Sequence, residues 1–388
     1  MEPAPDPQRH YGLDWLRIGA FAALIFYHVG MVFVPWNFHV KSTHIAAWLT
    51  LPMLATNAWR LTLLFVVSGY ASRALLARYP APGRFAANRS ARLLVPLAFG
   101  MILIVPPQPW VELVTRHGYD HGLASFWLRD YWRFSSLDGV ALPTWNHLWF
   151  VGYLWVYTLI LAVGVSLMRS TWLQRVFDRV FSGWWLLILP TAWFALVHGS
   201  WFTMVGETHA LVGDGIAHAS YLPAFLFGFA LAGSPAVLAA TVRLWKPAAA
   251  LALLGYAAVL AFELSFAAKA WAASWGYRPY GVAHAVQQWG TIVALIGVAE
   301  RYWNHDAAIR PMLTEAVFPF YIVHQTIIVV VMYWLLGAGL PGWAEFAILV
   351  AATVAGCWAF YLGGRAVPRL RPLIGLRQRQ RPAVPALL

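Results

Sequence analysis

Long stretches of apolar residues alternate with short polar gaps along the whole of this chain. Each stretch is roughly 17–25 residues long, which is the length that an α-helix needs to cross the hydrocarbon core of a bilayer. The pattern therefore predicts an all-α, polytopic integral membrane protein with about ten transmembrane helices. The predicted spans are Asp14–Val34, Asn57–Ala77, Ala91–Val105, Asn146–Met168, Trp184–Gly199, Gly215–Gly233, Pro247–Ala268, Val282–Glu300, Glu315–Gly337 and Trp343–Gly363.

Two apolar stretches are less regular than the others. Ala91–Val105 is short for a span, and the prolines in Pro106–Pro109 predict that the chain leaves the membrane there. Ile45–Ala55 is apolar but contains Pro52, which favours a re-entrant or interfacial helix. The longest predicted loop is Pro106–Trp145, and the sequence shows no internal repeat and no water-soluble domain.

Composition agrees with a membrane location. Hydrophobic residues make up 61% of the 388 residues and charged residues 11%, whereas charged residues make up about 25% of an average soluble domain. The 23 Trp residues suit the two membrane interfaces. The net charge of +12 comes from Lys and Arg in the short gaps, without a basic face interleaved with aromatic residues. This distribution indicates topology signals, and we expect no nucleic-acid partner.

The basic residues also predict the orientation. With the N-terminus in the cytoplasm, most Lys and Arg lie on the inner side, and both termini are cytoplasmic. We expect a cytoplasmic segment at 1–13, a transmembrane domain at 14–365 and a basic cytoplasmic tail at 366–388. The first apolar stretch contains Asp14 and Arg17 and has no small-residue cleavage site, so it is predicted to be an uncleaved helix. Cys357 is the only cysteine and is predicted to be a small apolar helix residue.

Polar residues inside the predicted spans are candidates for function, because charge in hydrocarbon is costly. The first span holds Asp14, Arg17 and His28. Arg17 and His28 are eleven residues apart, so on a helix they point nearly the same way, about 16 Å apart. Asp14 and Arg17 are three residues apart and can pair. Alternatively, Arg17 snorkels to the interface and His28 makes a hydrogen bond between packed helices.

Further candidates lie after the second span and in the fourth and ninth spans. Arg89 and Arg92 share a helix face at a cytoplasmic mouth, where arginine forks suit phosphate oxygens, although ordinary positive-inside charge explains them equally well. His147 opens the fourth span, and Tyr321 and His324 share a face of the ninth. Histidine is the common general base near pH 7.

Other motifs carry little chemistry. The segment from His117 to His121 has metal-ligand residue types but lies in a glycine-containing loop, so we predict no metal site. Glu263 lies inside a span, where a buried polar contact is the simplest interpretation. The sequence has no Walker loop, HExxH or CxxC motif.

Five short motifs occur in one order and together resemble a known family. They are Arg17-x10-His28, Phe65-Val-Val-Ser68-Gly69-Tyr70, Arg89-x-x-Arg92, His147-Leu-Trp149-Phe150 and Tyr321-x-x-His324. In this respect the chain resembles the acyltransferase 3 family of multispan membrane enzymes over residues 10–365. Two further segments, Trp36–Ser42 and Tyr221–Gly228, resemble the branch that succinylates periplasmic glucans.

The resemblance implies a ten-helix enzyme of the inner membrane. It would transfer an acetyl or succinyl group from cytoplasmic acetyl-CoA or succinyl-CoA to a hydroxyl group of an extracytoplasmic carbohydrate. It implies that His28 is the catalytic histidine, with Arg17 as its motif partner, and that Arg89 and Arg92 bind the CoA phosphates. Less defined positions of the family motifs are Asp14, His39, Ser68, His147, Trp149, Tyr321 and His324. No permanently bound cofactor is implied.

The sequence is compatible with several partners and with a second class of function. The partners expected are membrane lipid, acyl-CoA and a carbohydrate, with a homo-oligomer or proteins of glycan biosynthesis as further options. Many glycan-acetylating relatives carry a hydrolase-like domain, and from this sequence we expect none here. None of the motifs is assigned to binding the free carboxylate of a succinyl group. Lys41, Arg60 and Arg116 are the candidates for that role. The alternative function is a transporter or exporter of an anion, lipid or sugar, with Asp14, Arg17, Glu263 and His28 as a relay; a membrane scaffold ranks below both.

Overall fold

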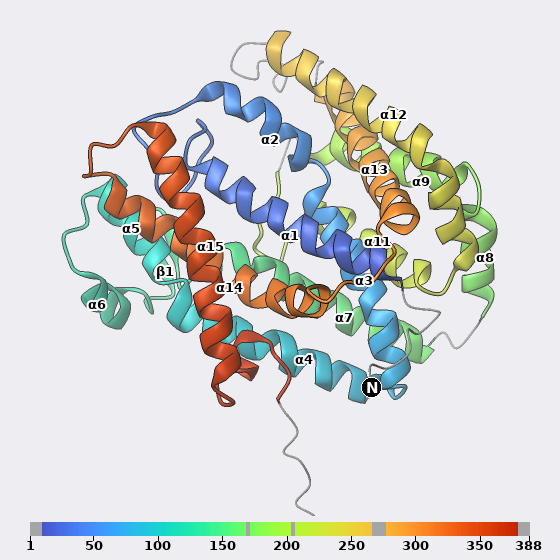
Figure 1. Ribbon diagram of the computed structural model, residues 1–388, viewed down its shortest axis with the longest axis horizontal. Coiled ribbons are helices and arrows are strands. Elements are labelled where there is room, and N and C mark those ends of the chain that lie inside the picture. Colours follow the sequence, from blue (N-terminus) through green and yellow to red (C-terminus); the bar gives the residue numbers. More distant parts are fainter. Residues whose placement is uncertain (1–9, 168–170, 203–205, 266–276, 379–388) are drawn as a thin grey trace, which may run out of the picture. The chain divides into compact units, whose positions relative to one another are not determined.

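The structure of the protein is a computed structural model that describes residues 10–167, 171–202, 206–265 and 277–378, and it is mostly helical (Figure 1). The chain divides into two compact units. Unit 1 consists of Met1–Gly30, Ala46–Asn88 and Tyr153–Thr314. Unit 2 consists of Met31–Ile45, Arg89–Gly152 and Glu315–Leu388.

The polytopic helical fold is confirmed. Among the described residues, seven helical segments are long and apolar enough to cross a membrane, and a bent pair makes an eighth when counted as one span. The seven are Ala47–Arg78, Pro82–His117, Asn146–Ser166, Pro235–Ser265, Tyr277–Tyr302, Arg310–Leu335 and Gly342–Ala366. The bent pair is Trp172–Phe181 with Trp185–Ser200, and Gly215–Leu231 is a shorter apolar helix. The first predicted span corresponds to α1 (Tyr11–Met31), which carries Asp14, Arg17 and His28. With the segments above, each predicted span has a helical counterpart in the described parts of the chain.

The helical segment continues past Pro106–Pro109, where the sequence predicted that it would end as the chain leaves the membrane. Helix α4 (Pro82–Phe99) passes into a π-helical turn at Gly100–Ile104 and then into α5 (Pro107–His117), within one apolar segment. Proline is tolerated in the first turn of a helix, because the N–H groups there have no partner inside the helix. The prolines therefore begin α5 instead of ending the helical segment, and the predicted loop starts only after α5.

Ile45–Ala55 is helical, as expected, but it joins the next span. A 3-10 turn at Ala47–Leu49 leads into α2 (Thr50–Asn57), and α3 (Arg60–Arg78) follows after two residues. Pro52 lies in the first turn of α2, where it costs no helical hydrogen bond.

In unit 1, glycine positions let helices pack at very short distances. Helices α12 (Pro235–Ser265) and α13 (Tyr277–Tyr302) run side by side (Figure 1). A Cβ atom placed on Gly255 would lie 2.4 Å from the Gln287 backbone nitrogen, and one on Gly297 would lie 2.4 Å from the Thr241 carbonyl oxygen. Small residues at such contacts are typical of membrane helices, where packing rather than the hydrophobic effect holds helices together. Unit 1 also contains α8 (Trp172–Phe181), α9 (Trp185–Val197), a π-helical segment at His198–Phe202 and α11 (Gly215–Leu231).

Large apolar side chains point outward on several helices. In α12, Leu253 and Leu254 are 69% and 66% exposed, and most of the apolar part of this helix is not buried inside the protein. In α15 (Gly342–Ala366), Phe346, Val354 and Leu362 are also exposed. Apolar surface of this extent is unfavourable in water but suits lipid. The chain is therefore a multi-pass integral membrane protein.

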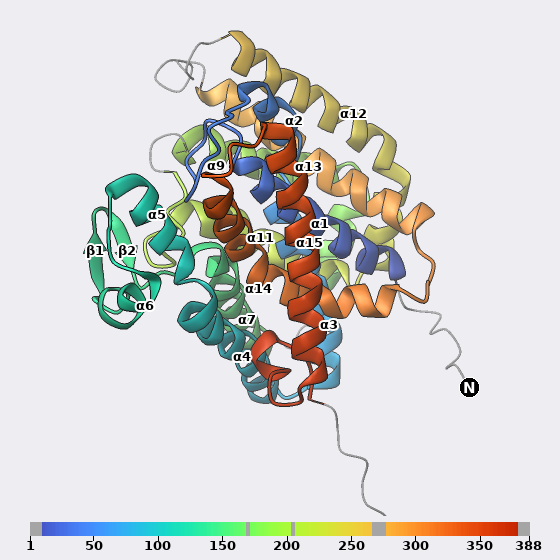
Figure 2. The same ribbon diagram turned by 60° about the vertical axis from the view of Figure 1, so that its left-hand side comes forward.

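Unit 2 contains a small hairpin beside its helices, which the all-α prediction missed. Strands β1 (Ser135–Leu137) and β2 (Val140–Leu142) pair antiparallel and lie near α5 and α6 (Leu123–Ser125) (Figure 2). Asp138 and Gly139 form the turn with φ of 47° and 83°, which is the two-residue Asp-Gly hairpin signal. A π-helical turn (Phe126–Asp130) precedes the hairpin, and Leu142 packs with Leu113 and Tyr131.

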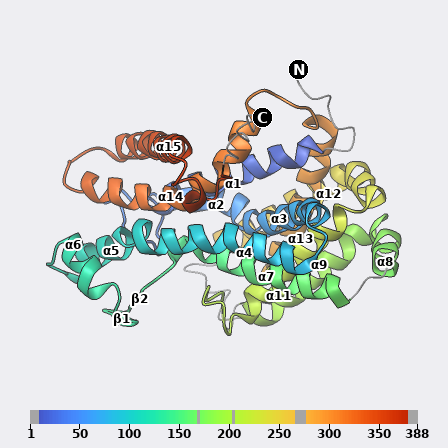
Figure 3. The ribbon, with the colours of Figure 1, turned by 90° about the horizontal axis from the view of Figure 1, so that it is seen from below.

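The remaining helices of unit 2 are α14 (Arg310–Leu335, from Glu315 onward), α15 and the start of α7 (Trp149–Leu167), which follows a 3-10 turn at Asn146–Leu148. Helices α14 and α15 lie side by side (Figure 3), and a Cβ atom on Gly356 would lie 2.8 Å from Ile327 Cδ1. A last 3-10 turn at Pro372–Ile374 packs Ile374 against Gly364 of α15.

Candidate active site

The residues proposed from sequence fall in both units. Asp14, Arg17 and His28 lie on α1, and Ser68 lies on α3, all in unit 1. The positions in unit 2 are Arg89 and Arg92 on α4, His39 in the segment 31–45, His147 in the 3-10 turn, Trp149 at the start of α7, and Tyr321 and His324 on α14.

The beginning of α1 is fixed by ionic and polar contacts. The Asp14 carboxylate accepts a hydrogen bond from Arg310 Nη1 at 2.6 Å, and Arg310 also binds Asp306. His10 lies 2.7 Å from Glu300 at the end of α13, and this hydrogen bond raises the pKa of His10 although partial burial opposes it. These contacts give Asp14 an anchoring role, and its pairing with Arg17 remains a prediction.

The other end of α1 brings His28 close to the beginning of α3. His28 is half-buried and its ring lies edge-on to that of Tyr27, with 6.0 Å between centroids. The Tyr27 hydroxyl donates to Asn57 Oδ1 at 3.2 Å, and the guanidinium carbon of Arg60 lies 3.4 Å from the centre of the Tyr27 ring. The half-buried Arg17 lies on the same helix, so α1 carries polar side chains along its length.

Two of the segments that carry the family resemblance pack directly against each other in unit 1. Phe65 of α3 stacks on Tyr221 of α11, with 4.8 Å between ring centroids. A Cβ atom on Gly69 would lie 1.9 Å from the Phe225 carbonyl oxygen, and one on Gly228 would lie 1.9 Å from the Val66 carbonyl oxygen. The glycines of both segments are therefore required for the close contact between α3 and α11.

Acidic residues before α11 were not predicted from sequence. Both carboxylate oxygens of Glu207 accept from the Tyr221 hydroxyl at 2.9 Å. Asp214 caps α11 by accepting from the Ala217 N–H, and it also accepts from the Tyr153 hydroxyl and the His209 N–H. Burial raises the pKa of Asp214, but these donors outweigh it and keep the pKa below the usual value. The only sequence signal was an acidic residue just before an apolar run.

In unit 2, the structure brings together His147, Tyr321 and His324, which come from distant parts of the sequence. His147 Nε2 donates to the carbonyl oxygens of Tyr321 and Ile322, each at 3.1 Å, and the Tyr321 hydroxyl donates back to the His147 carbonyl oxygen. The rings of His147 and His324 lie 5.1 Å apart between centroids. His324 Nδ1 donates to carbonyl oxygens of its own helix. These bonds join the beginning of α7 to α14.

An amide network that the sequence analysis missed surrounds this group. Gln108 Oε1 accepts from Asn146 and Gln325, both at 3.0 Å, and Gln108 Nε2 donates to Thr326 Oγ1 at 2.7 Å. Gln108 is fully buried, and its Nε2 lies 3.5 Å from His147 Nδ1. Gln325 lies inside a predicted apolar span, where a polar side chain must find partners, and this was a signal that the sequence offered. Gln108 gave no such signal, because it falls in the predicted loop Pro106–Trp145.

The segment 31–45 of unit 2 holds polar contacts of another kind. His39 lies 2.6 Å from Glu112, which also pairs with Arg116 at 3.5 Å. Lys41 Nζ donates to the carbonyl oxygens of Met31, Val34 and Trp36. Burial, with the nearby Arg116 charge, lowers the pKa of Lys41 to about 8. These side chains brace their own segment.

Arg89 and Arg92 lie three residues apart within α4, so both leave the helix on the same side, and both are half-buried. Trp149 is buried at the beginning of α7. Ser68 is half-buried on α3, directly before Gly69, and its carbonyl oxygen accepts from the Ser72 hydroxyl. Glu263 makes the polar contact expected of it, because it accepts from the Tyr280 hydroxyl at 3.1 Å.

Comparisons with known proteins confirm the resemblance to the acyltransferase 3 family. The acyltransferase domain of the acyltransferase 3 family matches residues 10–362. Proteins named glucans biosynthesis protein C are similar over part of the chain: that of Escherichia coli K12 is 31% identical over 160 residues, and that of E. coli O6:K15:H31 is 32% identical over 161 residues. The aligned part is 41% of this chain and 39% of those proteins, so it spans about two fifths of the relatives' length. No solved structure matches the chain.

Proposed function

Because the chain belongs to the acyltransferase 3 family of membrane enzymes, we propose that it transfers an acetyl or succinyl group from cytoplasmic acyl-CoA to a carbohydrate hydroxyl group outside the cytoplasm. The observation that carries the proposal is the family match across nearly the whole chain, with Arg17 and His28 both on α1. The partial similarity to proteins named for glucan biosynthesis supports a glucan as acceptor.

In this proposal His28 is the general base. The acceptor hydroxyl oxygen attacks the thioester carbonyl carbon, and the hydroxyl proton passes to His28 as the new ester bond forms. The carbon–sulfur bond then breaks, CoA leaves as a thiolate, and the proton held by His28 returns to it or to water. Arg17 is the motif partner of His28. An acyl-enzyme is the alternative route, in which a side chain carries the acyl group before the acceptor takes it.

Arg89 and Arg92 are proposed to bind the phosphates of CoA. Those phosphates are polyanionic and do not enter hydrocarbon, so the enzyme needs cations where CoA enters. Two arginines on one side of α4 offer paired N–H donors suited to phosphate oxygens. His147, Tyr321 and His324 are proposed to position the helices around them, which agrees with the bonds from His147 to α14.

The first test compares glycans from cells that make the wild type or the His28→Ala variant, in a host without its own copy of the enzyme. Mass spectra of periplasmic and surface glycans should show an added acetyl or succinyl group with the wild type alone. The control is His121→Ala, whose side chain is exposed in a loop of unit 2 and should leave the product unchanged. Unmodified glycans in every strain, with the protein present in the membrane, would contradict the glycan acceptor.

The second test measures the acyl-CoA KM of purified protein. Release of CoA is followed with a thiol reagent, and the only cysteine, Cys357, is buried and gives little background. The Arg89→Ala and Arg92→Ala double variant should raise KM by about 10-fold or more, because it removes charge-assisted bonds to phosphate. Arg84→Ala is the control on the same helix, since its side chain is exposed. An unchanged KM in the double variant would remove the phosphate assignment.

A further inference from the structure

Arg60 is a buried cation without an acidic partner among the described residues. It lies at the beginning of α3 and is 6% exposed. Its guanidinium donates to Asn57 Oδ1 at 2.9 Å and stacks on the Tyr27 ring, while its buried Nε has no hydrogen-bond partner. No ion pair joins Arg60 to Asp or Glu in the parts of the chain that the structure describes.

Other basic side chains of comparable burial are compensated. Arg310, which is 3% exposed, pairs with two aspartates, and Arg371, which is 6% exposed, pairs with Glu315 and two carbonyl oxygens. Three residues were candidates for binding an acyl carboxylate. Of these, Arg116 pairs with Glu112, and Lys41 donates to three carbonyl oxygens. Arg60 is the candidate that keeps unused donors.

A buried charge without a counter-charge is expensive, and more so inside a membrane span such as Ala47–Arg78. The stacked Tyr27 ring offers partial compensation, and the Asn57 amide offers one acceptor for a fork of five N–H donors. Both oxygens of Glu207 accept from the Tyr221 hydroxyl, and among the described residues no ion pair joins Glu207 to Arg60. An anionic ligand would complete the coordination of Arg60.

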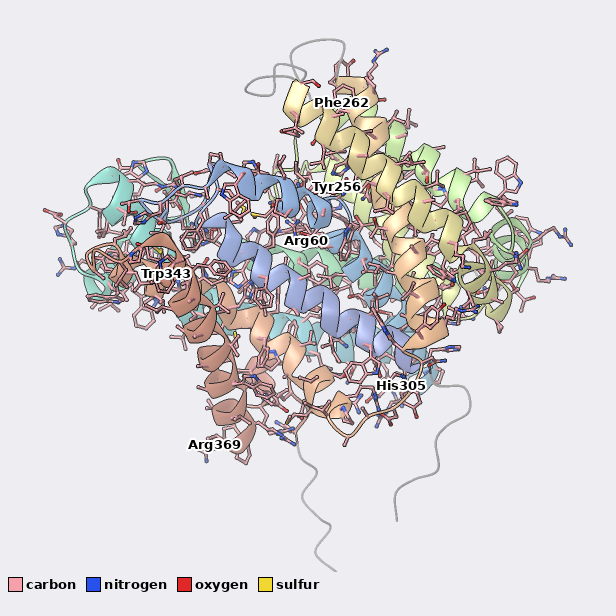
Figure 4. The ribbon with its side chains drawn as sticks, turned by 45° about the horizontal axis from the view of Figure 1, so that its top comes forward. Arg60, Tyr256, Phe262, His305, Trp343 and Arg369 are labelled. Atoms are coloured by element: carbon pink, nitrogen blue, oxygen red, sulfur yellow. The ribbon has the colours of Figure 1, made fainter. Side chains whose placement is uncertain are left out.

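The position of Arg60 limits which anion it can bind. The Arg60 guanidinium carbon lies 3.4 Å from the centre of the Tyr27 ring, and the centres of the Tyr27 and His28 rings lie 6.0 Å apart (Figure 4 marks Arg60 beside α1). The distance from the guanidinium to the His28 ring therefore cannot exceed the sum of these two distances. The pantetheine arm separates the CoA phosphates from the thioester by about 15 Å when extended. A succinyl group instead holds its free carboxylate about 4 Å from its thioester carbon. An anion at Arg60 during transfer at His28 therefore fits the acyl group better than the CoA phosphates.

We propose that Arg60 binds the free carboxylate of a dicarboxylic acyl group, so that the donor is a half-thioester of succinyl type and not acetyl-CoA. The inference rests on the proposed function, with His28 as the residue at which transfer occurs. The carboxylate takes no part in bond making: the thioester bond breaks and the ester bond forms at the other end of the acyl chain. Arg60 holds that end still by two parallel N–H bonds while the acceptor attacks.

The first measurement uses the wild type alone, in lipid nanodiscs with periplasmic glucan as acceptor. CoA release is compared for succinyl-CoA, acetyl-CoA and succinamoyl-CoA, in which a neutral amide replaces the free carboxylate. We expect kcat/KM for succinyl-CoA to exceed both others by about 10- to 100-fold, since a charge-assisted pair in a buried site is lost with each of them. Equal use of succinyl-CoA and succinamoyl-CoA would overturn the carboxylate assignment while leaving acyl transfer intact. Absence of release from every donor would contradict the proposed function as well.

The second measurement compares Arg60→Gln with Arg73→Gln. Arg73 is a matched control, because it also lies on α3, stacks on an aromatic ring (Phe229) and bonds to an amide (Gln174). Arg60→Gln should lower kcat/KM for succinyl-CoA by about 10- to 100-fold and change that for acetyl-CoA by less than about 3-fold, thus removing the preference. Arg73→Gln should retain it. An equal loss with both donors in Arg60→Gln would show that Arg60 only supports Tyr27 and would overturn the inference.

Discussion

The contact between α3 and α11 gives a prediction whose size follows from the structure. Adding one methyl group by Gly69→Ala would place its carbon 1.9 Å from the Phe225 carbonyl oxygen, where ordinary contact begins at 3.4 Å. The neighbour is backbone of a helix and cannot rotate away, so the two helices must separate. Overpacking costs about 1–3 kcal/mol, and a backbone obstacle puts Gly69→Ala near the upper end of that range. Gly228→Ala should cost a similar amount, because its Cβ would meet the Val66 carbonyl oxygen at 1.9 Å.

The two changes should not add. Once one methyl group has moved the helices apart, the second meets an open gap, so the double variant should lose about 3 kcal/mol and not the roughly 6 kcal/mol of independent sites. The assay is unfolding of purified protein in mixed micelles by increasing denaturing detergent, followed by Trp fluorescence, with CoA release measured on the same samples. Gly19→Ala on α1 is the control. Its Cβ would have no neighbour within 4 Å, so it should stay within about 1 kcal/mol of the wild type.

Two results would refute this reasoning. A Gly69→Ala variant as stable as the wild type would mean that α3 and α11 are not in close contact at this position. Additive losses in the double variant would mean that Gly69 and Gly228 act at separate contacts. Since Phe65 and Tyr221 stack at the same interface, the predicted separation should also lower activity in each single variant.

Two further predictions concern polar contacts. Gln108→Leu should destabilise the protein by about 2–4 kcal/mol, because it leaves Asn146, Gln325 and Thr326 without their amide partner; an unchanged detergent midpoint would contradict the network. His10→Gln should remove a pH dependence of stability: the raised pKa of His10 means that its bond to Glu300 stabilises the fold below the unfolded pKa of about 6.5 and is lost as pH rises through the folded pKa. Melting temperatures from pH 5.5 to 8.5 should therefore decline less steeply in the variant. The corresponding difference in the free energy of unfolding should stay below about 1 kcal/mol, because His10 is only half-buried and solvent screens its bond to Glu300.

Much of the fold could be predicted from the pattern of apolar and polar residues. Length and continuity of apolar runs determine membrane helices, because only a helix of that length satisfies its backbone in lipid. The prediction failed where the same residue types are compatible with two local structures. The prolines after Ala91–Val105 can end a helix or begin one, and the structure uses Pro107 to begin α5. The hairpin at Asp138 and Gly139 had a local signal, but it was hidden in a long loop.

The sequence by itself determined the class of protein and the order of its motifs, because helix length and intramembrane charge are local properties. It also placed Arg17 and His28 on one helix. Only the tertiary structure decided which residues meet: His147 with Tyr321, Phe65 with Tyr221, and Arg60 with Tyr27. The sequence offered no reason to prefer Lys41, Arg60 or Arg116 as the residue that binds an acyl carboxylate. They became different once folding gave two of them partners and left Arg60 without an acid among the described residues, since whether a charge is compensated depends on neighbours distant in sequence.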